Sequence, residues 1–246
     1  SYLSAGPDDL VFELGGKLYL LDPGTLKYRK VDVKIISDLS AEMARRVSVG
    51  RQIRNMTLSP DGKRVIFEAR GDLFNLPVKE GYTINMTRSS GAFDREPSWS
   101  PDGKYIAYWS DKSGEYQIYL SDTAGKIKET QLTNREHGYG YQLYWSPNSL
   151  NLAFIDEKNN ISIIDIKTKK TVIAGNTRWN TGHGRRGRYP IAWSPDSKWI
   201  SFTEGLDNGN SAIFLYQLST ANKHQATSGF YNDSDPVFSE DGQYLF

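Results

Sequence analysis

The 246-residue chain contains no cysteine, which excludes a disulfide framework and any metal site built on thiolates. It has no apolar run near the ~18 residues that a transmembrane helix needs, so no membrane span is expected. Charge of one sign is also missing, because 30 basic and 29 acidic residues leave a formal net charge of +1. A general nucleic-acid binder usually carries a marked basic excess, so no nucleic-acid partner is expected. These absences leave the compartment open between periplasm and cytoplasm.

Histidine is scarce, and the three present, His137, His183 and His224, all fall in or near predicted loops. A Ser-His-Asp site needs a histidine held by a carboxylate beside an activated serine. No G-x-S-x-G motif is present to supply that serine, and no H-x-H or H-x-x-x-H pair offers metal ligands. We therefore predict no catalytic residue, no metal site and no cofactor within this chain.

What the chain does have is a repeated turn motif. Ser-Pro-Asp-Gly, or a close variant, occurs five times at spacings of 41, 46, 48 and 45 residues. Serine, proline with its fixed φ, aspartate and a closing glycine suit the four positions of a type I turn. Because the aspartate recurs with the turn, we interpret it as a turn former rather than a catalytic acid. The motifs occupy residues 59–62, 100–103, 146–149, 194–197 and 239–242.

Each motif is predicted to join the first two of four short strands. In 96–133 the strands are expected at 97–100, 105–109, 116–121 and 128–133. Four strands repeating every 41 to 48 residues are typical of a β-propeller, which usually has ~4–8 blades. The sequence thus predicts an all-β fold, a propeller of four-stranded antiparallel blades, with a β-sandwich as the next best alternative. One domain is expected over 1–246, with blades at 1–33, 53–87, 96–133, 142–174, 190–227 and a partial one at 235–246.

The final blade breaks off inside its second predicted strand. An aromatic-rich strand without a partner would leave an exposed edge that invites aggregation. We therefore expect the chain to be a segment of a longer protein.

The stretch 97–119 resembles the WD40-like repeats of TolB-type propellers. It has the pattern P-x-W-S-P-D-G-K-x-I-A-Y-x-S-D-x-S-G-x-x-x-I-Y, without the Gly-His and Trp-Asp marks of true WD40 repeats. Further runs sharpen the resemblance: RVIFEARGD at 64–72, MTRSSG at 86–91 and DREPSW at 94–99, with FE at 12–13 and KLY at 17–19. Together they make essentially the whole chain similar to the N-terminal propeller region of tricorn-type proteases.

This resemblance implies a function. Tricorn-type proteases are large peptidases in which propellers precede a PDZ domain and a serine-peptidase core. The propellers are thought to form channels for peptides rather than to hydrolyse them. The resemblance implies a non-catalytic segment that gates or steers peptides, with peptides and the remaining domains of its own chain as partners, and a homo-oligomer left open. The alternatives are a TolB-like interaction scaffold of the cell envelope and an oligopeptidase propeller that filters substrates by size.

Arginine and lysine are divided between two sets of loops. In a four-stranded meander, the links between blades lie on the same face as the turns between second and third strands, here called the link face. The predicted links hold ten of the fourteen arginines but one of the sixteen lysines. The planar guanidinium group can bind a carboxylate through two hydrogen bonds. We therefore predict that the link face binds a peptide or a domain, with candidate residues Arg88, Arg95, Arg135, Arg178, His183, Arg185, Arg186 and Arg188.

Two alternatives stay open for these arginines: they brace long loops by bonding backbone carbonyls, or they stay solvated. The run Gly-His-Gly-Arg-Arg-Gly-Arg at 182–188 is the sharpest candidate, because its glycines let the backbone approach a ligand closely. RNA binding is a weaker explanation of this run, since the chain lacks a basic field. The long link 34–52 contains helix formers after Ser40, so a short helix is expected over 40–46.

Overall fold

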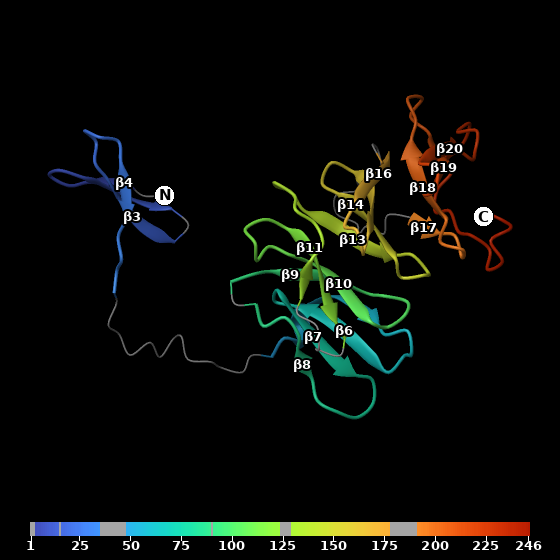
Figure 1. Ribbon diagram of the computed structural model, residues 1–246, viewed down its shortest axis with the longest axis horizontal. Coiled ribbons are helices and arrows are strands. Elements are labelled where there is room, and N and C mark those ends of the chain that lie inside the picture. Colours follow the sequence, from blue (N-terminus) through green and yellow to red (C-terminus); the bar gives the residue numbers. More distant parts are fainter. Residues whose placement is uncertain (1–2, 15, 35–47, 90, 124–128, 178–190) are drawn as a thin grey trace. The chain divides into compact units, whose positions relative to one another are not determined.

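The computed structural model describes residues 3–14, 16–34, 48–89, 91–123, 129–177 and 191–246. They belong to two compact units, Ser1–Val47 and Ser48–Phe246, each of which is described by itself (Figure 1). The helix expected over 40–46 lies outside the described residues. Within them the helical content is a single 3₁₀ turn, Gly50–Gln52.

Twenty short strands form five four-stranded sheets, and in each sheet the strands pair antiparallel in chain order. The first unit holds β1 (Leu3–Ala5), β2 (Leu10–Leu14), β3 (Lys17–Leu21) and β4 (Tyr28–Lys30). Blade two holds β5 (Ile53–Leu58), β6 (Arg64–Ala69), β7 (Asp72–Pro77) and β8 (Ile84–Asn85), and blade three holds β9 (Asp94–Trp99), β10 (Tyr105–Ser110), β11 (Gln117–Asp122) and β12 (Thr130–Gln131). Blade four holds β13 (Gly140–Trp145), β14 (Asn151–Asp156), β15 (Asn160–Asp165) and β16 (Thr171–Asn176), and blade five holds β17 (Ile191–Trp193), β18 (Trp199–Gly205), β19 (Ser211–Gln217) and β20 (Asn222–Gln225).

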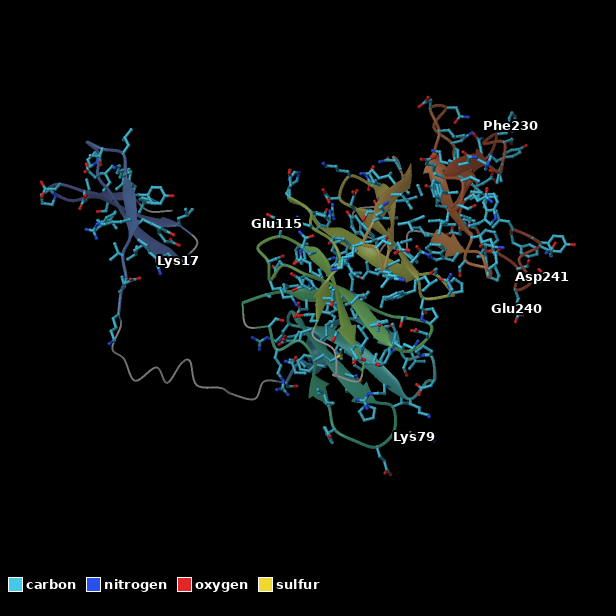
Figure 2. The ribbon with its side chains drawn as sticks, viewed as in Figure 1. Lys17, Lys79, Glu115, Phe230, Glu240 and Asp241 are labelled. Atoms are coloured by element: carbon cyan, nitrogen blue, oxygen red, sulfur yellow. The ribbon has the colours of Figure 1, made fainter. Side chains whose placement is uncertain are left out.

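The predicted fold class, all-β with four-stranded antiparallel meanders, is confirmed. After blade five the chain forms the fifth turn, which contains Asp241 (Figure 2), and one antiparallel bridge between Phe238 and Leu245.

The first strands of blades two, three and four contain an irregularity that the alternating pattern did not reveal. The register shifts in β5 between Ile53 and Met56, in β9 beside Glu96, and in β13 between Gly140 and Leu143. Glu96 takes a left-handed φ of 53° there. An extra residue at a bulge breaks the period of two, so the sequence placed the start of β9 at Pro97 instead of Asp94.

Successive first strands lie side by side in the second unit, as strands nearest a propeller axis should. The Trp145 indole Nε1 donates a hydrogen bond to the Ser98 carbonyl at 3.1 Å, and that of Trp193 donates to the Tyr144 carbonyl at 3.0 Å. Each tryptophan therefore bonds to the first strand of the preceding blade. The Trp99 indole instead turns back to the Gly103 carbonyl of its own turn at 3.3 Å.

Apolar side chains fill the seams between these blades. Between blades three and four, Trp109 is fully buried, packs edge-on against Phe154 with ring centroids 5.5 Å apart, and donates to the Tyr141 carbonyl at 2.7 Å. A Cβ at Gly140 would lie 1.9 Å from the Trp109 ring, so only glycine fits there. The seam between blades four and five is built similarly around Phe202, Ile200 and Ile155. Hydrophobic burial of this kind supplies most of the stability of a small repeat, at about 25 cal/mol per Å².

Candidate functional site

The five turns that carry the repeat are built alike. In each, the serine hydroxyl donates to the aspartate or asparagine side chain two residues on, at 2.6 to 2.7 Å. These hydroxyl groups, with a backbone N–H donor, hold the pKa of Asp61, Asp196 and Asp241 below the ordinary value. A carboxylate bonded within its own turn is a turn former, as the sequence predicted. The end of the strands that carries these turns is called the turn face.

On the opposite, link face, the structure describes Arg88, Arg95 and Arg135. The other candidates, Arg178, His183, Arg185, Arg186 and Arg188, lie outside the described residues, as does the run 182–188.

Arg135 lies in the link between blades three and four and is held by residues of both blades. Its guanidinium group donates to the Glu157 carboxylate at 2.7 Å and to the Tyr139 carbonyl at 3.2 Å, and lies 5.7 Å from the centre of the Trp109 ring. Its backbone is pinned by Gln117, which accepts from the Arg135 N–H and donates to the Arg135 carbonyl. Burial works to raise the pKa of Glu157, but its own backbone N–H and Arg135 together hold that pKa below the ordinary value. Arg135 therefore braces the link by bonding a backbone carbonyl, which is one of the two alternatives left open for these arginines.

Arg95 is more open. Its guanidinium lies 3.7 Å from the Glu96 carboxylate and 5.8 Å from the centre of the Tyr116 ring, with about a quarter of the side chain exposed. Glu96 itself faces Glu68 of blade two, and the Asn55 amide donates to both carboxylates, at 2.9 and 2.8 Å. Burial raises the pKa of Glu96, the Glu68 charge raises it further, and Arg95 opposes both. Arg95 thus lies partly exposed beside a bridged pair of carboxyl groups, with longer contacts than those of Arg135.

Tyr139 contacts Arg135 directly and lies within the electrostatic influence of Arg95. Its carbonyl accepts from Arg135, and its hydroxyl lies 3.2 Å from that of Tyr141. The hydrogen bond with Tyr141 raises the pKa of Tyr139, burial adds to the shift, and the Arg95 charge opposes it. These contacts define an arginine–tyrosine cluster across blades three and four: Arg95, Tyr116, Arg135, Tyr139 and Tyr141.

Arg88 does not join this cluster. It is exposed, has a φ of 45°, and donates from Nε to the Asn85 carbonyl at 3.3 Å. The tyrosines, in contrast, were missed by sequence reasoning, although the run Tyr-Gly-Tyr at 139–141 forms the end of a predicted link, 134–141. Tyrosine and arginine together suit peptide binding, because an aromatic face covers apolar atoms while a guanidinium binds carbonyl or carboxylate oxygens.

The residues that the structure describes contain no group of three or more His, Cys, Asp or Glu side chains that could hold a metal ion. None of their helices is long and apolar enough to cross a membrane. His224, one of the two described histidines, faces the Trp199 ring at 6.3 Å.

Comparison with known proteins agrees with this architecture. A model of the family described as the tricorn protease second beta propeller domain matches residues 53–246. The chain belongs to this tricorn propeller family. A tricorn protease homolog of Saccharolobus solfataricus is 18% identical over 237 residues, which are 96% of this chain and 21% of that protein.

Solved structures show the same fold. The crystal structure of the tricorn protease matches 97% of this tricorn propeller chain and 22% of its own length, with a TM-score of 0.70 and 18% identity. A TolB structure from Agrobacterium tumefaciens matches 93% of the chain and 76% of its own length, with a TM-score of 0.55 and 21% identity. The chain spans about a quarter or less of the curated relatives that it matches, for example 26% of a tricorn-like protease C-terminal subunit from Sulfurisphaera tokodaii.

Proposed function

We propose that this chain is a non-catalytic propeller of a tricorn-like serine peptidase, and that it steers extended peptides to or from a catalytic core outside these 246 residues. The observation that carries the proposal is the arginine–tyrosine cluster on the link face of a tricorn-family propeller. Arg95 offers donors for a peptide carbonyl or carboxylate, and Tyr116 and Tyr139 offer aromatic surface beside it. Membership of a peptidase family supports peptides as the ligand.

The test is made in the intact parent protein. Changing Arg95 to Ala should lower kcat/KM for long peptides by about tenfold to a hundredfold, because a hydrogen bond to a charged group contributes roughly 1.5–3 kcal/mol. A two-residue substrate that need not contact the propeller should be cleaved as before. Arg51, exposed in the 3₁₀ turn, gives the matched control as Arg51→Ala. Equal loss for long and short substrates, or no loss at all, would contradict steering by this cluster.

The run 182–188 needs a test of its own. Arg185 and Arg186 should be changed together to Ala in the intact protein, and peptidase activity and assembly measured. We expect weaker cleavage of long peptides or weaker assembly. If both are unchanged, the run has no part in the proposed function.

A TolB-like interaction scaffold is the second candidate, favoured by the TolB match over 93% of the chain and 76% of that protein. The two candidates differ in the sequence that they require beyond residue 246. A PDZ domain and serine core downstream favour the peptidase, whereas a frame that ends after one more blade favours the scaffold.

A further inference from the structure

The turns of neighbouring blades are joined by a hydrogen bond at two of the seams. The Asp102 N–H of blade three donates to the Ser149 hydroxyl oxygen of blade four at 3.0 Å. The Asn148 N–H of blade four donates to the Ser197 hydroxyl oxygen of blade five, also at 3.0 Å. Both serines are buried and hold left-handed φ angles of 60° and 61°. A hydroxyl group at the fourth position of one turn thus bridges to the third residue of the turn before it.

The seam between blades two and three lacks this bridge. Blade three has Gly103 at the fourth position, with φ 74°, and a Cβ built there would meet no atom within 4 Å. Among the described residues, no side chain of blade three accepts from the Asp61 N–H, which is left to its own carboxylate. A cleft of about 390 Å³ opens here, lined by Ser59, Pro60, Asp61, Arg64, Trp99, Pro101, Asp102, Gly103 and Thr123. Its volume lies within the ≈ 300–1,000 Å³ range of ligand-binding clefts.

We propose that this blade 2–3 cleft binds a segment of extended peptide, whose carbonyl or hydroxyl oxygen takes the place that Ser149 and Ser197 hold at the other seams. The neighbouring seams show the required chemistry directly, since each places a neutral oxygen on the equivalent N–H. The cleft also offers apolar surface against which the apolar part of the peptide can pack. Trp99 uses its indole Nε1 on the Gly103 carbonyl, which leaves its ring face for packing, and Pro60 and Pro101 line the same cleft.

Charges of both signs surround the cleft. The Ser59 hydroxyl and the Lys63 N–H hold the pKa of Asp61 low; burial works to raise that of Asp102, but Ser100 and Lys104 keep it low too. Both carboxylates are therefore ionised at neutral pH. Arg64 is engaged by Asn75, with Nε donating to Oδ1 at 2.6 Å, and the Lys63 and Lys104 pairs with Asp61 and Asp102 are exposed and weak. Two carboxylates thus lie beside three cationic groups, Arg64, Lys63 and Lys104, so charge excludes neither acidic nor basic peptides, and the seam chemistry favours a neutral oxygen as the ligand atom.

This inference takes peptides as the ligand class from the proposed function, but the site is a second one. The cleft lies at the turn face, and the arginine–tyrosine cluster lies at the link face. An experiment can therefore contradict peptide binding in the cleft without contradicting steering by the arginine–tyrosine cluster, and the reverse.

The test is binding of fluorescein-labelled decapeptides to the 246-residue chain, monitored by fluorescence anisotropy. Three peptides of Gly, Ser and Pro are used, one neutral, one with two lysines and one with two glutamates. Gly103→Asn should weaken binding of the neutral peptide about fivefold, because its side chain fills the cleft and competes for the Asp61 N–H. Asparagine tolerates the left-handed φ, so the fold should be kept.

Gly62 provides the matched control. It holds the same turn position in blade two, with φ 67° and open space around it, and does not line the cleft. Gly62→Asn should leave binding unchanged, and Gly103→Ser, which copies the other seams, should weaken it. Arg95→Ala should leave it unchanged as well, even if that variant abolishes steering in the intact protein. Absence of binding of the neutral peptide to the native chain, or equal effects of Gly103→Asn and Gly62→Asn, would overturn the proposal.

Discussion

At the scale of single residues, the fourth position of each turn shows how the choice between glycine and serine changes the contact between two neighbouring blades. Glycine holds a left-handed φ without cost, whereas a residue with a Cβ is strained there by about 1 kcal/mol or more. Ser149 and Ser197 accept this strain, and each hydroxyl satisfies an N–H of the preceding blade. The sequence shows the exchange of glycine for serine, but not what the hydroxyl contacts, because its partner lies 47 residues away for Ser149.

The balance between the strain of the left-handed φ and the hydrogen bond of the serine hydroxyl gives a first prediction. Ser149→Ala should lower the free energy of unfolding by about 1–2 kcal/mol, because it leaves the Asp102 N–H without its acceptor and keeps the strained φ. Ser149→Gly loses the same bond but relieves the strain, so its loss should be smaller by about 1 kcal/mol. Urea unfolding of both variants measures the difference. A glycine variant less stable than the alanine variant would show that strain is not part of the balance.

The pKa of Glu96 gives a second prediction. Burial first, and then the Glu68 charge, raises this pKa, so the folded chain binds the proton more tightly than the unfolded chain does. The stabilising effect is present below the ordinary value of 4.5 and is lost as pH rises through the folded-state pKa. Glu96→Gln keeps an oxygen for Asn55 without the charge, so it should be more stable than the native chain at pH 7 and about equal to it at pH 4. Melting temperatures at the two pH values provide the measurement. A variant less stable at pH 7 would mean that the Arg95 ion pair outweighs burial.

At the scale of elements, the meander was predictable and the bulges were not. Turn chemistry at fixed spacing defines four strands in each blade, because Ser-Pro-Asp-Gly fixes where one strand ends and the next begins. The bulge beside Glu96 depends on its bonds to Glu68 and Asn55 of the neighbouring blade, which a local pattern does not contain. The candidate site was likewise predictable only in part. The sequence placed Arg95 and Arg135 on one face, but Tyr139 and Glu157 became visible as their partners only through the fold.

The seam between blades three and four supplies a third prediction. Gly140→Ala should destabilise the chain by about 3 kcal/mol, because the new methyl group overlaps the buried Trp109 ring that packs across this seam. Gly50→Ala is the matched control, since a Cβ there meets nothing within 4 Å and its φ is not left-handed. Chemical unfolding of both variants should separate them clearly. A small effect at Gly140 would mean that the seam can shift to accept a methyl group, contrary to its close packing.

At the scale of the whole molecule, the two faces carry different chemistry. The turn face holds lysines paired with turn aspartates, as in Lys104 with Asp102 at 3.2 Å, and these exposed pairs add little stability. On the link face, Arg135 is braced and Arg95 lies beside a tyrosine. One propeller domain over 1–246 stays a prediction, since the first sheet belongs to a separate compact unit and the family match begins at residue 53. The sequence repeats identify each blade, but they do not tell which blades belong to the same propeller ring.

The balance of charge over the molecule leads to the last prediction. With a net charge of +1 the chain lacks the field that non-specific nucleic-acid binding needs, although 182–188 contains three arginines. A labelled 20-nucleotide single-stranded RNA should therefore show no binding at 0.15 M salt up to about 10 μM protein. The measurement is fluorescence anisotropy, with Arg185 and Arg186 changed together to Ala as the comparison. Binding that is lost in this variant and falls steeply with salt would assign the run to RNA instead of peptides, because displaced counterions produce that salt dependence whereas contacts with a neutral peptide do not.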